Sequence, residues 1–244
     1  MNNHIIFIAD LHLSPTQPKV TNLFFKFIED TAPKADALYI LGDFFKFWVG
    51  DDDRSIFNEQ IKKALKTISS KIPVYLMPGN RDFILGQTFA KESGCILISD
   101  PYKIDLYNKP TLLTHGDILC SKDIKHCIFR TITRFPHGIA IFLKLPLKFR
   151  TWLASSIQKY SAKTKLSKDK STLLPQTSTI KKLMVKFATN QIIHGHIHRI
   201  EEDEFTINNQ KMRCISLDAW TDSGSILIYH QNGQYEFENF IIQR

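Results

Sequence analysis

Five short polar motifs each follow a run of apolar residues in this chain. Their side chains offer carboxylate, amide and imidazole donors, with no thiolate among them. Donors of this kind suit a hard or borderline divalent ion such as manganese better than a structural zinc. The motifs therefore predict a metal centre, provided that the fold brings them together. They are Asp10-Leu11-His12, Gly42-Asp43, Gly79-Asn80-Arg81-Asp82, His115-Gly116-Asp117 and Gly195-His196-Ile197-His198.

In two of the motifs, the spacing of the side chains would let both bind the same ion. Residues i and i+2 of an extended segment point to the same side, so Asp10 and His12 can bind one ion together, and so can His196 and His198. Asp43 carries two oxygens at a strand end and can bind two cations at once. One grouping then gives the first ion Asp10, His12, Asp43 and His198, and the second ion Asp43, Asn80, His115 and His196.

Such a pair of ions would perform phosphoryl chemistry. Two ions ~3.5–4 Å apart activate water and stabilise the attacking and leaving oxygens of an in-line displacement at phosphorus. Each motif alone has an ordinary explanation, since Asp-x-His is commonly a polar pair at a strand end and Gly-Asp a turn. His194 is typical of a core histidine or of one that supports a ligand. Five motifs at five strand ends in chain order favour the metal centre.

The apolar runs before the motifs predict short buried strands at residues 5–9, 37–41, 74–77, 111–114 and 192–193. Amphipathic spacing predicts helices at 18–31, 53–70, 82–93 and 175–190, and the Asp51–Asp53 run could supply a helix N-cap. Further short strands are expected at 96–98 and 102–106, and the tail predicts hairpins that turn at 208–210 and 231–233. Strands that alternate with helices early and form hairpins late predict a mixed two-sheet α/β architecture.

The composition changes at about residues 121–174, which we interpret as a helical cap inserted within a single domain of residues 1–244. The net charge is +8, and between residues 144 and 186 eleven basic residues face Asp169 alone. Such a field favours an anionic partner: phosphates, a nucleic acid or an acidic membrane surface. Apolar residues between Ile128 and Ile157 are interleaved with Arg130, Arg134, Lys144, Lys148 and Arg150. This pattern predicts a face that rests on anionic lipids, and the alternative is a cap packed on the core with a solvated basic face.

The totals also bear on the compartment. No stretch approaches ~18 uninterrupted apolar residues, and the N-terminus lacks the pattern of a secretory signal, so we expect a cytoplasmic protein. The four cysteines form no CxxC pair and are predicted to be reduced core residues.

Taken together, the five motifs resemble those of the calcineurin-like metallophosphoesterase superfamily. The resemblance implies a four-layer α/β/β/α sandwich with two metals at the sheet edges. Most members have a histidine after the asparagine, where this chain has Arg81. Arginine donates no proton at physiological pH, but its planar fork clamps phosphate oxygens. The leaving group should then need no protonation, which points to cleavage of a pyrophosphate bond, with Asp43 and Arg81 as the catalytic residues.

Within the superfamily, Gly79-Asn80-Arg81-Asp82, the aromatic and acidic stretch 43–53 and the basic apolar insertion resemble the enzymes of lipid A biosynthesis that hydrolyse UDP-2,3-diacylglucosamine. The resemblance implies two Mn²⁺ ions and attack of water on the uridine-side phosphorus. It also implies the products UMP and 2,3-diacylglucosamine 1-phosphate, and a peripheral position on the cytoplasmic face of the inner membrane. Its implied substrate contacts are Asn80, Arg81, Asp123, Ser161, Lys165, Lys168 and His196.

Two other functions fit part of the pattern. A phosphodiesterase or nuclease could use the basic insertion to contact a nucleic acid backbone, but strand binding favours exposed aromatic and polar groups over the aliphatic excess found here. We therefore expect no nucleic acid partner. A scaffold without activity is disfavoured because a candidate ligand is present at every position of the pattern. Another nucleotide pyrophosphatase of the same superfamily remains an alternative.

Overall fold

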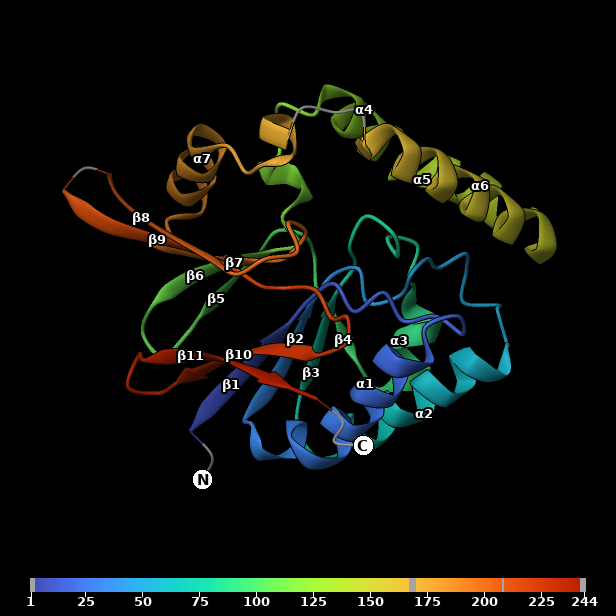
Figure 1. The fold of residues 1–244 in the computed structure, drawn as a ribbon, viewed down its shortest axis with the longest axis horizontal. Coiled ribbons are helices and arrows are strands. Elements are labelled where there is room, and N and C mark those ends of the chain that lie inside the picture. Colours follow the sequence, from blue (N-terminus) through green and yellow to red (C-terminus); the bar gives the residue numbers. More distant parts are fainter. Residues whose placement is uncertain (1–2, 167–169, 208, 242–244) are drawn as a thin grey trace.

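The computed structural model describes residues 3–166, 170–207 and 209–241, and its body contains two β-sheets (Figure 1). The first sheet has the strand order β11-β10-β1-β2-β3-β4 and the second the order β5-β6-β7-β9-β8. The first consists of β1 (His4–Ile8), β2 (Ala37–Leu41), β3 (Val74–Met77), β4 (Ile96–Leu97), β10 (Gly224–His230) and β11 (Tyr235–Phe240). The second consists of β5 (Tyr102–Asp105), β6 (Pro110–Thr114), β7 (Gln191–His194), β8 (Glu201–Ile207) and β9 (Gln210–Ser216).

The strands predicted before the motifs are confirmed, and their directions bring the motifs to common edges. β1, β2 and β3 run parallel in the first sheet, and β6 and β7 run parallel in the second. Because the carboxyl ends of parallel neighbours meet at one edge of a sheet, each set delivers its motifs to one place. The two tail hairpins are also confirmed by the antiparallel pairs β8–β9 and β10–β11, although residue 208 of the first turn lies outside the described residues.

Period-2 alternation produces the layers. In β1, Ile6 and Ile8 share a buried cluster with Phe24 of α1 (Pro18–Asp30), whereas Phe7 shares another with Ile193 of the second sheet. A third cluster joins the outer face of the second sheet to one more helix. The sandwich is therefore helix, sheet, sheet, helix, as expected. The outer layers are α1 (Pro18–Asp30), α2 (Ile56–Ser69) and α3 (Gln87–Ser93) on one side and α7 (Thr177–Phe187) on the other.

Three helices lie together outside this body (Figure 1). They are α4 (Ile124–Thr133), α5 (Pro136–Leu143) and α6 (Leu147–Leu166), which we call the cap. Among residues 124–161, whose side chains are all described, only Arg150 is buried, at 1% exposed. The cap is thus not attached by an apolar core of its own. Within the described residues, no helix combines the length and the apolar character that crossing a bilayer requires.

Three of the five basic residues predicted for a lipid-facing surface are instead paired with carboxylates of the body, which corrects that prediction. Arg130 and Arg134 lie against Asp100 and Asp117, and Arg150 pairs with Asp52. Buried carboxylates require partners, and these guanidinium groups provide them. Lys144 and Lys148 are exposed.

Two helix starts also differ from the prediction. The helix expected from residue 82 begins at Gln87. The Asp82 carboxylate accepts from the N–H groups of Gly79 (2.7 Å) and Phe45 (3.1 Å), so it does not cap a helix that starts at that residue. Ser55 caps α2 by accepting from Asn58 N, so the run Asp51–Asp53 does not supply that cap. Asp51 instead accepts from Gly86 N and Phe89 N at the start of α3.

The four cysteines are free, as predicted. Cys95, Cys120 and Cys214 are buried, but Cys127 on the cap is only half-buried and is not a core residue.

Candidate metal centre

The loops after β1 and β2 are joined by backbone hydrogen bonds that place their motifs side by side. Asp10 N donates to Gly42 O at 3.1 Å, and His12 N donates to Asp43 O at 2.9 Å. The loop after β7 joins them from the second sheet, where His196 N donates to Asp10 Oδ2 at 2.6 Å. Motifs almost 190 positions apart in the chain therefore form one cluster.

One group of possible ligands contains Asp10, His12 and His198. Their ligand atoms all lie within 4.8 Å of one another. His12 Nε2 and His198 Nε2 are 3.4 Å apart, and Asp10 Oδ1 lies 3.3 Å from His198 Nε2. These are three of the four residues predicted for the first ion.

A second group contains Asp10, Asp43 and His115, again within 4.8 Å. His115 Nε2 lies 2.8 Å from Asn80 Oδ1 and 3.6 Å from Asp43 Oδ1. Asp43 Oδ2 is also 3.9 Å from His12 Nδ1, so its carboxylate lies between the two groups, where a shared ligand is expected. Asp10 belongs to both groups, which the sequence did not indicate.

His196 lies beside the second group. Its ring packs edge-on against His115, with centroids 5.1 Å apart, but it is in neither compact group. Burial, and next the neighbouring charge of His115, hold the pKa of His196 well below its usual value. Its imidazole is therefore neutral and able to donate a lone pair.

Backbone geometry at the centre is unusual. Positive φ angles occur at Asp10 (54°), His12 (51°), Asp43 (50°), His196 (72°) and His198 (56°). Residues other than glycine rarely adopt this region, and its cost is tolerated chiefly at functional sites. Gly42, at φ 89°, is required for the close approach of the loops, because a Cβ there would lie 2.5 Å from His115 Nδ1 and 2.8 Å from Gly79 Cα.

The electrostatics fit a cation. Burial acts to lower the pKa of His115, but the carboxylates of Asp43 and Asp10 outweigh it and raise that pKa to about 9. Protonated His115 thus takes the place of a positive charge among buried carboxylates. Its Nδ1 lies 3.0 Å from Leu41 O and donates to it, so Nε2 is the nitrogen that faces Asn80 Oδ1 at 2.8 Å. Without a metal ion the protonated ring donates from Nε2 to this oxygen. A divalent cation bound here would replace that proton, and both Nε2 and Asn80 Oδ1 could then donate lone pairs to it.

Two further atoms support the same fit. Asp10 Oδ1 and His12 Nδ1 are buried and make no hydrogen bond within the described part of the chain. Burial lowers the pKa of His12 to about 4, against the pull of Asp43, so this ring is also neutral. Carboxylate, amide and neutral imidazole donors with unfilled bonding capacity suit divalent ions of the manganese type.

The predicted substrate contacts are only partly brought together. Asn80, Arg81 and His196 lie at the centre, where Arg81 donates from its backbone N and its Nε to the two oxygens of Asp43, at 2.9 and 3.1 Å. Asp123 is buried at the start of α4 and accepts from His126 N at 3.1 Å. Ser161 is exposed on α6. The side chain of Lys165 and all of Lys168 lie outside the described residues.

Sequence reasoning missed two residues that contact this region. His126 of α4 lies against His196, with ring centroids 5.8 Å apart, and no local motif marks it. Asp82 was noticed only as part of its motif. Burial and the charge of Asp43 raise its pKa to about 7, while its two backbone hydrogen bonds hold the turn that carries Asn80.

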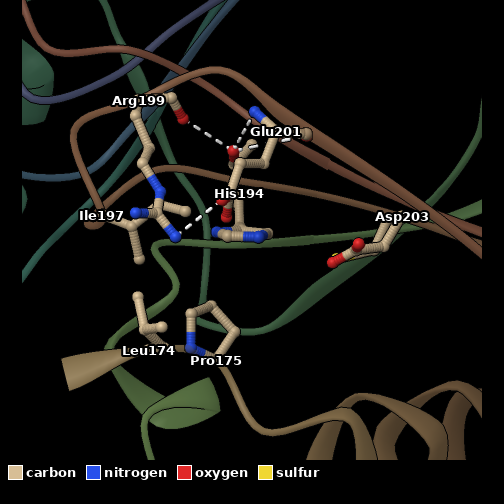
Figure 2. Close-up of a pocket in the computed structure, with 9 residues that line it drawn as sticks. Leu174, Pro175, His194, Ile197, Arg199, Glu201 and Asp203 are labelled. Atoms are coloured by element: carbon tan, nitrogen blue, oxygen red, sulfur yellow. Dashed lines mark hydrogen bonds and ion pairs between the residues drawn. The ribbon is translucent and has the colours of Figure 1, made fainter. Parts of the chain in front are cut away.

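His194 is a buried histidine outside the two ligand groups, in line with its predicted role (Figure 2). Its Nδ1 lies 2.8 Å from Gly195 O. It lines a cavity of about 220 Å³ together with Leu174, Pro175, Ile197, Arg199, Glu201, Asp203, Cys214 and Ser216. Figure 2 shows Arg199 and Glu201 turned towards each other there, and their ion pair measures 2.6 Å.

This chain is similar to several known proteins. A family model described as calcineurin-like phosphoesterase matches residues 4–200. A UDP-2,3-diacylglucosamine hydrolase of Coxiella burnetii (strain RSA 331) is 42% identical over 98% of both chains. One from Vibrio parahaemolyticus is 37% identical over 96% of this chain and 97% of its own. Among solved structures, an archaeal phosphodiesterase has a TM-score of 0.49 at 12% identity, over 97% of this chain and 99% of that one.

Proposed function

This chain belongs to the calcineurin-like phosphoesterase family, and from that membership we propose that it hydrolyses UDP-2,3-diacylglucosamine to UMP and 2,3-diacylglucosamine 1-phosphate. The family makes the chain a hydrolase with a metal centre. The substrate is proposed because relatives similar over nearly the whole chain are named for it. The observation that carries the proposal is the hydrogen bond from Arg81 to Asp43. Arg81 occupies the position at which most members of the family have a histidine that can donate a proton.

Arg81 suits a diphosphate. Its guanidinium is about one third exposed and bonds Asp43 through Nε, so its remaining N–H groups can bind phosphate oxygens. Because it stays protonated, it stabilises negative charge but supplies no proton. A departing sugar phosphate needs none, since a phosphate monoester is a stable anion at neutral pH. Asn80 precedes Arg81 in the same turn and His196 packs against His115, and both would orient the same diphosphate.

We assign two Mn²⁺ ions to the centre, one held by Asp10, His12, Asp43 and His198 and the other by Asp43, Asn80, His115 and His196. The bound ions would lower the pKa of water and neutralise the diphosphate. Asp43 lies between the two ligand groups and accepts a hydrogen bond from Arg81, which would bind the reacting phosphate beside the ions. The uridine-side phosphorus would be attacked and the lipid phosphate would leave.

The cap would bind the acyl chains and the membrane. Several large apolar side chains of the cap are exposed to solvent, and clusters of this kind commonly mark a contact with lipid or protein. Their exposed fractions are 55% for Ile128, 66% for Ile132, 57% for Phe135, 66% for Ile141 and 61% for Trp152. Lys144 and Lys148 are exposed on the same helices or beside them and would contact anionic headgroups. We place the protein on the cytoplasmic face of the inner membrane, with Asp123, Ser161, Lys165 and Lys168 binding the substrate headgroup.

Hydrolysis in ¹⁸O-water tests the proposal. Purified protein with Mn²⁺ should convert UDP-2,3-diacylglucosamine with the label entering UMP, as followed by ³¹P NMR and mass spectrometry. A chelator should abolish turnover and Mn²⁺ should restore it. UDP-N-acetylglucosamine, cyclic nucleotides and duplex DNA serve as substrate controls. No turnover, or a preference for a control substrate, would refute the assigned substrate, and label in the sugar phosphate would refute the direction of attack.

Flotation with vesicles tests the membrane contact. Phosphatidylglycerol vesicles should carry the protein to the top of the gradient, and phosphatidylcholine vesicles should carry less. Trp152→Ala should weaken flotation, because it removes a side chain that is 61% exposed on the cap. Equal flotation of wild type and variant on both vesicle types would contradict this contact.

A further inference from the structure

Helix α4 meets the body through a compact cluster of two arginines and two carboxylates. Arg130 donates from Nε to Asp117 Oδ2 at 2.9 Å and from Nη2 to Asp100 Oδ2 at 3.0 Å. Arg134 lies 3.6 Å from each of the same two oxygens. The Asp100 and Asp117 side chains are 2% and 0% exposed, whereas the arginines are about one quarter exposed. None of these four residues belongs to the ligand groups described above.

The cluster contacts the loops of two candidate ligands. Asp100 Oδ1 accepts from His115 N at 3.2 Å and from Thr114 Oγ1 at 2.6 Å. Arg134 Nη2 donates to Gly79 O at 3.0 Å, and Gly79 immediately precedes Asn80. The tips of these loops meet where Asn80 Oδ1 and His115 Nε2 lie 2.8 Å apart. One helix of the cap is therefore connected to the loops that carry Asn80 and His115.

We propose that Arg130 and Arg134 are positioning residues that hold Asn80 and His115 in place for a divalent cation, so that the seating of the cap on the body sets the affinity of the metal centre. The inference rests on the proposed metal centre. Its physical basis is that groups behind the ligands fix their orientation, and that a guanidinium fork can bind two carboxylates and a carbonyl at once.

A purely electrostatic effect would have the opposite sign. Arg134 is a cation near the centre, so removing its charge alone would favour a second cation there and tighten metal binding. Loss of positioning would weaken metal binding, because the Gly79–Asn80 turn loses its hydrogen bond and two buried carboxylates lose a partner. Replacement by lysine keeps the charge and removes the planar fork. The two variants together separate charge from geometry.

The test is calorimetric titration of the full chain with Mn²⁺, without substrate, for wild type, Arg134→Met, Arg134→Lys and Lys125→Met. Lys125 is an exposed residue of α4 with no hydrogen bond or ion pair to the described residues, so its replacement removes a charge from the same helix only. We expect Mn²⁺ binding about 10- to 100-fold weaker in both Arg134 variants and unchanged in Lys125→Met.

Unchanged or tighter binding in Arg134→Met, or full affinity in Arg134→Lys, would overturn the proposal. Circular dichroism checks each fold, and if Arg134→Met does not fold, Arg134→Lys decides the question against wild type. Turnover of UDP-2,3-diacylglucosamine by wild type is measured separately. Failure of the proposed substrate would therefore leave the Mn²⁺ titration intact as a test.

Discussion

Replacing Arg150 with methionine should loosen the cap and leave the two-sheet body folded. Arg150 is the only buried residue between residues 124 and 161, and it joins the start of α6 to the loop before α2. Its guanidinium donates to Val49 O at 2.6 Å, to Leu145 O at 2.9 Å and to both oxygens of Asp52. Methionine keeps most of the aliphatic stem and loses every one of these bonds.

The magnitude follows from what each partner does afterwards. Hydrogen bonds from a charged donor contribute about 1.5–3 kcal/mol each, and two of them end on backbone carbonyls, those of Val49 and Leu145. The Asp52 side chain is 60% exposed and is hydrated once the arginine is gone, so that ion pair adds little. Removing a buried guanidinium also relieves part of its desolvation cost. We expect a net loss of about 2–3 kcal/mol, borne by the cap.

Amide hydrogen exchange measures this loss locally. A loss of about 2–3 kcal/mol corresponds to exchange about 30- to 150-fold faster in α5 and α6, with the rates in β1 and β2 unchanged. Lys148→Met is the matched control, since it removes a charge from an exposed position two residues earlier on the same helix. If Arg150→Met exchanges no faster than the control, or if the strands exchange faster as well, the cap does not depend on this residue as argued.

Three further substitutions test the metal centre and the proposed substrate contacts. Asp43→Ala should abolish turnover in steady-state kinetics, because the carboxylate lies between both ligand groups, and full activity would refute a shared-ligand role. Lys165→Ala should raise KM for UDP-2,3-diacylglucosamine and leave kcat close to wild type, and the reverse split would exclude a binding role. Gly42→Ala should cost about 1–2 kcal/mol in backbone strain alone and should also displace His115, lowering both urea stability and activity. Gly138→Ala, whose new Cβ would meet only Ile132 O at 3.7 Å, should do neither, and equal losses in the two glycine variants would contradict the steric argument.

The sequence predicted those parts of the fold that depend on patterns within short segments of the chain. An apolar run that ends in an aspartate or a histidine is visible within ten residues, and parallel pairing then brings such ends together. That is why the sequence alone predicts that the motifs around Asp10, Asp43 and His115 meet at one centre. The apolar run at residues 5–9 likewise predicted a buried strand, and β1 is buried against α1 on one face and against the second sheet on the other.

The rest depended on partners distant in the chain. Nothing near Arg150 indicates that it pairs with Asp52, which lies 98 residues earlier. Without knowledge of that partner, Arg150 is predicted to be one more exposed basic residue of the cap. Asp82 favoured a helix start by type, yet its carboxylate accepts hydrogen bonds from Gly79 and from Phe45, and the second lies on another loop. In each case a tertiary hydrogen bond overrode a local preference.

The candidate ligands come from both halves of the sandwich, since the loops after β1, β2 and β3 belong to one sheet and those after β6 and β7 to the other. Any ion held by Asp10 and His198, or by Asp43 and His115, is consequently a cross-link between the sheets as well as a cofactor. Its binding free energy then opposes separation of the two halves, and the chain should resist denaturation more strongly as the free metal concentration rises. In this architecture, the concentration of free metal therefore sets how firmly the two sheets are held together.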